Sequence, residues 1–362
     1  MSELIDNQFF QLLQCSIGKR AALDAPIAEN KWEGAFYLAK KHALVGIIFD
    51  VMLNLPEEQM PPRKIMLKFA MGAEVIATWN HKSNGHMADL KGIFKETGMP
   101  VCVLKGQGLA TLYPKPDRRQ CGDIDLWVDG SFDRIMDFLE NGGWTLDRLY
   151  RHHIGVDFFK DKIKVEVHFH PSWFNSPFTN RKLKRYFAQA KAAQFANENE
   201  TLGIAVTTSS FNCVYILLHI FRHLFDEGVG LRQLLDYYYV LLHSSEEDRR
   251  ESFETIKDLR LGKFSAALMW VMQQVFLLDD GYLLCRPDEQ MGRLLLEEIL
   301  LSGNFGRFDK RNNDKGKSFF HHFARRIKRL VKFLPMNAGE VLWAPLFRVY
   351  QYFWRIRKGY RY

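Results

Sequence analysis

The stretch GDIDLWV, residues 122–128, decides the fold expected for this chain of 362 residues. Its apolar residues are dense enough for a central strand. Because successive side chains of a strand point to opposite faces, Asp123 and Asp125 share one face and Ile124 lies on the other. Two carboxylates this close raise each other's pKa, whereas a divalent cation between them makes their proximity favourable. The stretch therefore predicts a cation-binding strand face; the alternative is a solvent-facing edge with two harmless aspartates.

A second stretch, KVEVHFH at residues 164–170, adds a third carboxylate. Alternation places Glu166, His168 and His170 on one strand face. The preceding run HIGVDFFK, residues 153–160, predicts the other arm of an antiparallel hairpin. If this hairpin packs beside residues 122–128, Glu166 completes a trio that suits Mg²⁺ or Mn²⁺ and in-line phosphoryl transfer. Taken alone, Glu166 could equally face water.

Basic residues near these strands are candidates for binding phosphate. Lys105 and Gly106 end the strand-like run PVCVLKG where a short helix begins, so helix amides and the lysine charge could hold a phosphate there. Arg119, four residues before Asp123, could bind phosphate in a bidentate manner or pair with the aspartates as a counter-ion. Both interpretations of Arg119 stay open.

The spacing of apolar residues along the sequence divides the chain into three regions. Apolar residues three and four apart predict helices through most of residues 1–97 and again through residues 206–362. Residues 98–205 carry the strand patterns. We therefore expect an α+β protein in which a small mixed β-sheet core is flanked by N-terminal and C-terminal helical regions.

Charge is concentrated at the C-terminal end. Residues 307–362 contain 15 Lys and Arg against 3 Asp and Glu, whereas the whole chain carries +8. Basic residues mixed with aromatic ones could contact a membrane surface or another polyanion, or the aromatic residues could pack while the bases face solvent. Five scattered cysteines without a CxxC pair, no signal pattern and no long apolar run predict a cytoplasmic protein, with peripheral membrane contact left open.

Three motifs in order, LKGQGLATLYP, RQCGDIDLWV and VEVHFHPSW, resemble those of the uncharacterised bacterial nucleotidyltransferase family within the DNA polymerase β-like superfamily. The helical flanks are also similar, in the segment from His219 to His223 and in GLRQLLD. The resemblance thus covers most of the chain. One departure is Gln107, where many active superfamily members carry a serine that helps to hold the triphosphate.

The resemblance implies a metal-dependent enzyme that transfers a nucleoside monophosphate from a nucleoside triphosphate to an acceptor that the motifs do not define. Its motifs fall on Gly106, on Asp123 and Asp125, and on Glu166 and His168. In the main hypothesis the three acids hold the metal ions, and Lys105 and Arg119 bind the phosphates, with Gly106 and His168 also at the nucleotide.

Arg232 is either the partner of Asp236 within one helix or a residue that faces the nucleotide or the acceptor across a cleft. Two other functions stay open. Gln107 motivates a catalytically silent, nucleotide-binding regulatory module, and the pair His168 and His170 motivates a transition-metal-dependent hydrolase.

Overall fold

A seven-stranded mixed sheet forms the centre of the computed structural model, which describes residues 3–157, 163–309, 311 and 331–358. The strands follow the spatial order β3-β4-β5-β2-β1-β7-β6. β2 runs parallel to β5 and β1 runs parallel to β7, while the other neighbours are antiparallel. The strands are β1 (Val101–Val103), β2 (Ile124–Val128), β3 (Thr145–Leu149), β4 (His153–Asp157), β5 (Lys164–His168), β6 (Glu198–Asn199) and β7 (Ile204–Val206).

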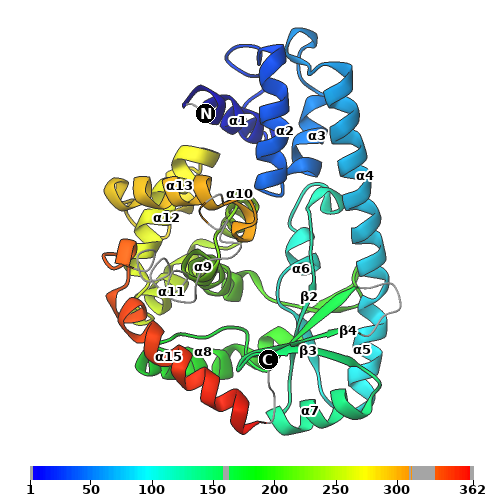
Figure 1. Ribbon diagram of the computed structural model, residues 1–362, viewed down its shortest axis with the longest axis vertical. Helices are drawn as coiled ribbons and strands as arrows, with labels where there is room; N and C mark the ends of the chain where they lie inside the picture. Colours follow the sequence, from blue (N-terminus) through cyan, green and yellow to red (C-terminus); the bar gives the residue numbers. More distant parts are fainter. Residues whose placement is uncertain (1–2, 158–162, 310, 312–330, 359–362) are drawn as a thin grey trace.

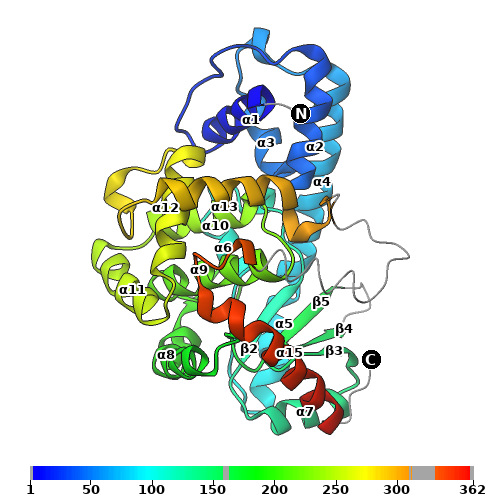
Figure 2. The same cartoon turned by 60° about the vertical axis from the view of Figure 1, so that its left-hand side comes forward.

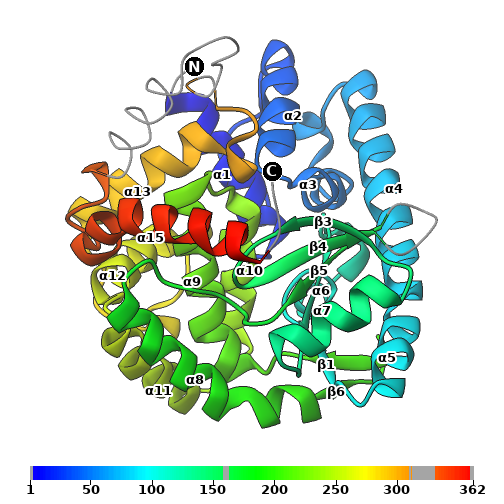
Figure 3. The same ribbon diagram turned by 60° about the horizontal axis from the view of Figure 1, so that its bottom comes forward.

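The α+β class is confirmed, but the expectation of a small sheet is wrong. The strands β3, β6 and β7 were not anticipated, and each lacks the pattern that marks a strand in a sequence. β3 is largely exposed and reads TLDRL, β6 has two residues, and β7 is a buried run of three. The predicted antiparallel pairing is confirmed for β4 and β5, which lie side by side with β3 in Figure 3, while residues 158–162 between them lie outside the described residues.

The two faces of β2 differ in what they contact. Ile124 and Leu126 belong to a core that includes Phe94 of α5 and Leu139 of α7. Trp127 points to the opposite face, where its ring lies 5.9 Å from that of Phe211 on α9. Because Asp125 alternates with Leu126, it too faces the C-terminal helices rather than the core under α5 and α7.

Helices from both ends of the chain build one further core. Side chains of the N-terminal helices and of the C-terminal helices belong to the same buried cluster. In Figure 1 the long helix α4 runs from the N-terminal helices to the side of the sheet. The helices are α1 (Glu3–Ser16), α2 (Trp32–Lys41), α3 (Val45–Met52), α4 (Arg63–Gly85), α5 (Met87–Glu96), α6 (Gln107–Ala110), α7 (Phe132–Asn141), α8 (Pro177–Ala196), α9 (Ser209–Asp226), α10 (Leu231–Leu242), α11 (Glu246–Asp258), α12 (Gly262–Phe276), α13 (Glu289–Ser302) and α15 (Ala338–Arg357).

Within the described ranges, no helix combines the length and the apolar character that crossing a bilayer requires.

Candidate active site

The parallel pairing of β2 with β5 brings together the carboxylates predicted from the sequence. Asp125 lies in register with Glu166, and Trp127 lies in register with His168. Asp123 directly precedes β2, two residues before Asp125, and therefore projects from the same face. Three acidic side chains from two neighbouring strands thus face the C-terminal helices.

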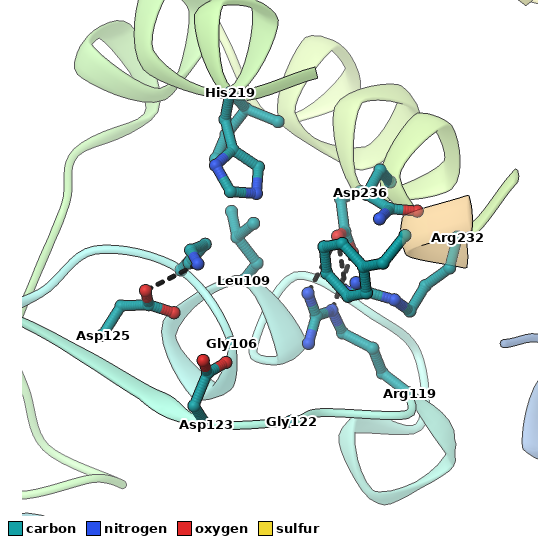
Figure 4. Close-up of a pocket in the computed structure, with 13 residues that line it drawn as sticks. Gly106, Leu109, Arg119, Gly122, Asp123, Asp125, His219, Arg232 and Asp236 are labelled. Carbon is teal, nitrogen blue, oxygen red and sulfur yellow. Dashed lines mark hydrogen bonds and ion pairs between the residues drawn. The ribbon is translucent and has the colours of Figure 1, made fainter. Parts of the chain in front are cut away.

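Asp125 is the most buried member of this group, with 1% of the residue exposed. Its Oδ1 atom lies 2.6 Å from Lys105 Nζ and 3.0 Å from His168 Nε2. The same His168 nitrogen lies 3.5 Å from Glu166 Oε2, and His153 Nε2 lies 3.8 Å from that oxygen. Figure 4 shows the contact of Asp125 with the lysine amino group. Lys105 and His168 thus act as internal counter-ions for the carboxylates.

The pKa values of the group reflect burial and mutual repulsion. Burial raises the pKa of Asp123 to about 7, and the charge of Asp125 adds to this rise. Burial opposes ionisation of Glu166 as well, but hydrogen bonding to His168 holds its pKa well below the usual range. Burial lowers the pKa of His168, yet hydrogen bonds to Asp125 and Glu166 outweigh it and raise the value to about 9. The site therefore favours bound positive charge.

The raised pKa of His168 predicts a pH-dependent share of stability in metal-free protein. A histidine whose folded pKa of about 9 exceeds its ordinary 6.5 stabilises the fold fully below pH 6.5, and this stabilisation is lost as pH rises through 9. In EDTA, the difference in melting temperature between wild type and His168→Gln should shrink from pH 6.5 to pH 9. A difference that stays constant over this interval would contradict a charged His168.

Gly106 shapes a narrow recess beside the carboxylates. Its φ of +61° is a conformation that glycine adopts without strain, and it lets the chain turn from β1 into α6. The recess has a volume of about 40 Å³ and is lined on one side by Lys105, Gly106, Asp123 and Asp125. Lys105 and Gly106 therefore line the same hollow as the aspartates, as the sequence predicts.

Arg119 and Arg232 line the opposite side of the recess, and both pair with Asp236. Arg119 donates to both carboxylate oxygens of Asp236, at 2.7 and 2.8 Å, and to Cys121 Sγ at 2.9 Å. Arg232 donates to Asp236 at 3.2 Å, and the Tyr113 hydroxyl donates to it at 2.7 Å. The counter-ion role considered for Arg119 thus has Asp236 as its partner, not Asp123 or Asp125. Figure 4 shows Arg119, Arg232 and Asp236 gathered on this side.

Removing the charge of Asp236 should destabilise the protein strongly. Arg119 is 1% exposed, so its guanidinium would be buried without a carboxylate partner. We expect Asp236→Asn to lower the free energy of unfolding by about 3 to 5 kcal/mol. Unfolding in urea, monitored by circular dichroism, measures this free energy. The matched control is Asp258→Asn, because Asp258 pairs with Lys182 on the surface. This variant should change the free energy of unfolding by less than about 1 kcal/mol.

A larger cleft opens outside the recess. Its volume is about 1030 Å³, and it shares Lys105, Asp123, His219 and Arg232 with the recess. The three carboxylates divide between the two hollows. Asp125 lines only the recess, Glu166 lines only the cleft, and Asp123 lines both.

Several residues of the cleft were not singled out in the sequence. Tyr215 is 1% exposed and lines the cleft, and its hydroxyl has no hydrogen-bond partner in the part of the chain that the structure describes. Trp173 and Arg222 lie on the same wall, with the guanidinium 4.4 Å from the indole ring centre. Tyr215 and His219 are four residues apart on α9, a spacing that places them on one helix face. That spacing is the signal by which Tyr215 could have been found.

The other histidines divide between the cleft and its surroundings. His219 lines both hollows, and burial lowers its pKa well below the usual range. Its ring lies 4.3 Å from that of His223, which also lines the cleft. His170 does not contribute to either hollow. The pair His168 and His170 is therefore not assembled at the carboxylates.

The donor set fits a divalent cation. Asp125, Glu166 and His168 each offer one ligand atom, and these three atoms lie within 4.8 Å of one another. Carboxylate oxygens suit Mg²⁺ or Mn²⁺, and the imidazole nitrogen adds a ligand that transition metals accept. Asp123 adds a further oxygen beside the group. Burial and then the charge of Asp125 raise its pKa to about 7, and a cation would relieve the repulsion between the two carboxylates.

A known protein family matches the part of the chain that carries these residues. Residues 28–277, which include every residue of the carboxylate group and of the Asp236 network, match the model of a family described as uncharacterised nucleotidyltransferase. No curated protein shows significant sequence similarity to the chain.

Proposed function

Since the chain belongs to the uncharacterised nucleotidyltransferase family, we propose that it transfers a nucleoside monophosphate from a nucleoside triphosphate to an acceptor hydroxyl or phosphate. The observation that carries the proposal is the in-register pairing of Asp125 with Glu166, with Asp123 directly before the same strand. Carboxylates close enough to share divalent ions support metal-assisted phosphoryl transfer.

Asp123, Asp125 and Glu166 would hold Mg²⁺ or Mn²⁺, with His168 beside them. When bound, the ions neutralise charge on the phosphates and favour ionisation of the acceptor oxygen. Lys105 pairs with Asp125 and adds a positive charge next to the recess. Glu166 lies on the cleft side and Asp125 on the recess side, so we assign Glu166 to the acceptor and Asp125 to the triphosphate.

The sizes of the two hollows support a division of the substrates. The recess, at about 40 Å³, is too small for a nucleoside but lies beside Gly106, Lys105 and Arg232, which suit phosphate oxygens. The cleft, at about 1030 Å³, is as large as the upper range of small-molecule sites and can take the nucleoside together with an acceptor. We therefore assign the terminal phosphates to the recess.

Gln107 and His170, which motivate the two other functions, lie outside both hollows. Gln107 is 2% exposed and lines neither hollow, so it does not occlude the recess. Its side-chain amide has no hydrogen-bond partner within the described ranges. The hydrolase required His170 at the carboxylates, and His170 lies outside both hollows.

A thermal-shift panel tests the proposal and identifies the nucleotide. The four ribonucleoside triphosphates are each combined with Mg²⁺, Mn²⁺ or EDTA. A ligand present at a hundred times its Kd stabilises the fold by about 2.7 kcal/mol. We expect at least one triphosphate to raise the melting temperature with a divalent ion and to have little effect in EDTA. Equal shifts with and without the ion would count against a metal-dependent site.

A further inference from the structure

Helix α15 (Ala338–Arg357) packs against the sheet region and the cleft through one of its faces. Near its start, Glu340 accepts hydrogen bonds from the backbone N–H groups of Asn175 and Ser176, at 2.9 and 3.0 Å. Glu340 also pairs with Arg222 at 3.0 Å. This buried carboxylate fixes the first turn of α15 to the wall of the cleft.

The other end of α15 is fixed to the sheet region. Arg355 is buried, and its guanidinium lies 4.7 Å from the ring centre of Tyr150. The Trp354 ring lies 5.8 Å from that of Phe132 at the start of α7. Between the two ends, α15 contributes Phe347, Arg348 and Gln351 to the lining of the cleft.

The opposite face of α15 is apolar and exposed. At spacings of four and three residues it carries Leu342, Leu346, Val349, Phe353 and Ile356, which are 67%, 59%, 57%, 61% and 48% exposed. We call these five residues the α15 stripe. In Figure 2 the helix lies at the front of the molecule, with no other labelled element in front of it. A continuous apolar stripe along a 20-residue helix marks an interaction surface.

Charge indicates what covers the stripe. The exposed residues Arg357 and Lys358 follow its last member, and Lys358 also pairs with Asp133 of α7. The sequence from residue 307 to 362 carries a net charge of +12, and its residues 312–330 lie outside the described part of the chain. Pairing two copies through this face would offer Arg357 no acidic partner on the facing helix, because the one acid of α15, Glu340, is buried and already bound to Arg222. Nucleic acid is bound by basic and stacking side chains, whereas the stripe is mostly aliphatic. An apolar helix face beside basic residues fits the interface of an anionic bilayer.

We propose that the α15 stripe docks the protein on an anionic lipid surface, with the helix lying in the plane of the interface. Leucine, isoleucine and phenylalanine side chains enter the boundary between headgroups and acyl chains, and the neighbouring bases meet anionic headgroups. The inner face of the same helix lines the cleft, so docking holds the cleft beside the headgroups. If the proposed transfer reaction is correct, the acceptor is carried at the membrane surface.

Vesicle sedimentation tests the docking without measuring catalysis. Full-length protein is mixed with phosphatidylcholine vesicles that either contain or lack phosphatidylglycerol. The double variant Leu346→Gln and Phe353→Gln removes two members of the stripe. The matched control is Leu67→Gln on α4, because Leu67 is 61% exposed but lies on another helix. We expect wild type to bind anionic vesicles more tightly than neutral ones, and the double variant to lose at least about tenfold in affinity.

Three outcomes would overturn the docking proposal. They are the absence of binding to anionic vesicles, an equal loss in Leu67→Gln, and a wild-type dimer by light scattering that the double variant abolishes. Asp125→Asn separates this proposal from the enzymatic one, since it leaves the stripe intact and should bind vesicles like wild type. Vesicle binding without turnover would leave the docking supported and the transfer reaction in doubt.

Discussion

Replacing Asp125 with asparagine is expected to abolish both metal-dependent triphosphate binding and nucleotidyl transfer. Asp125 is 1% exposed and offers the oxygen that meets Lys105 and His168. The substitution keeps the size of the side chain but removes the charge at the centre of the group. Because a neutral amide is a poor ligand for Mg²⁺ and leaves Lys105 without a close anionic partner, affinity and rate should fall together. Calorimetric titration and pyrophosphate release measure the two effects.

The matched control for this variant is Asp129→Asn. Asp129 directly follows the same strand but pairs with Lys191 outside both hollows. It should bind triphosphate like wild type. Unchanged metal-dependent binding by Asp125→Asn would remove Asp125 from the site, while a circular dichroism spectrum like that of wild type shows that the variant is folded.

Replacing Glu166 with glutamine is expected to separate binding from chemistry. Glu166 lines the cleft but not the recess to which we assign the terminal phosphates. Triphosphate affinity should therefore stay within about tenfold of wild type, which is about 1.4 kcal/mol. Turnover should fall by at least about a hundredfold, because a neutral glutamine would hold the ion on the acceptor side more weakly, and that ion favours ionisation of the acceptor oxygen. Calorimetry is paired with pyrophosphate release in the presence of a cell-extract acceptor pool.

Glu198→Gln serves as the control. Glu198 lies in the edge strand β6 of the same sheet and pairs with Lys91 of α5. This control should change neither triphosphate affinity nor turnover. If Glu166→Gln lost triphosphate affinity as completely as Asp125→Asn, the division of roles between the two carboxylates would be wrong.

The centre of the fold could be predicted from sequence because its strands alternate. β2 and the hairpin of β4 and β5 carry apolar residues at every second position, and the structure places them side by side. The strands β6 and β7 are two and three residues long and have too few positions for any period to be visible. β7 is a strand because it pairs with β1 about one hundred residues earlier, which is a tertiary effect.

The same distinction applies to the site. Asp123, Asp125 and Glu166 could be placed because strand alternation and the order of the motifs constrain them. The partner of Arg119 could not be predicted, because Asp236 lies 117 residues away in the sequence and the pairing depends on how α10 packs. The spacing of Arg232 and Asp236 did predict their contact, since residues four apart on one helix are neighbours.

The most direct test of the central claim is a calorimetric titration of the triphosphate selected by the thermal-shift panel into wild-type protein, with Mg²⁺, with Mn²⁺ and with EDTA. We expect binding of one triphosphate per chain with at least one of the two ions, at least about tenfold weaker binding in EDTA, and loss of the metal-dependent part in Asp125→Asn. Absence of binding with either ion, or equal affinity in EDTA, would contradict a metal-dependent nucleotide site at these carboxylates.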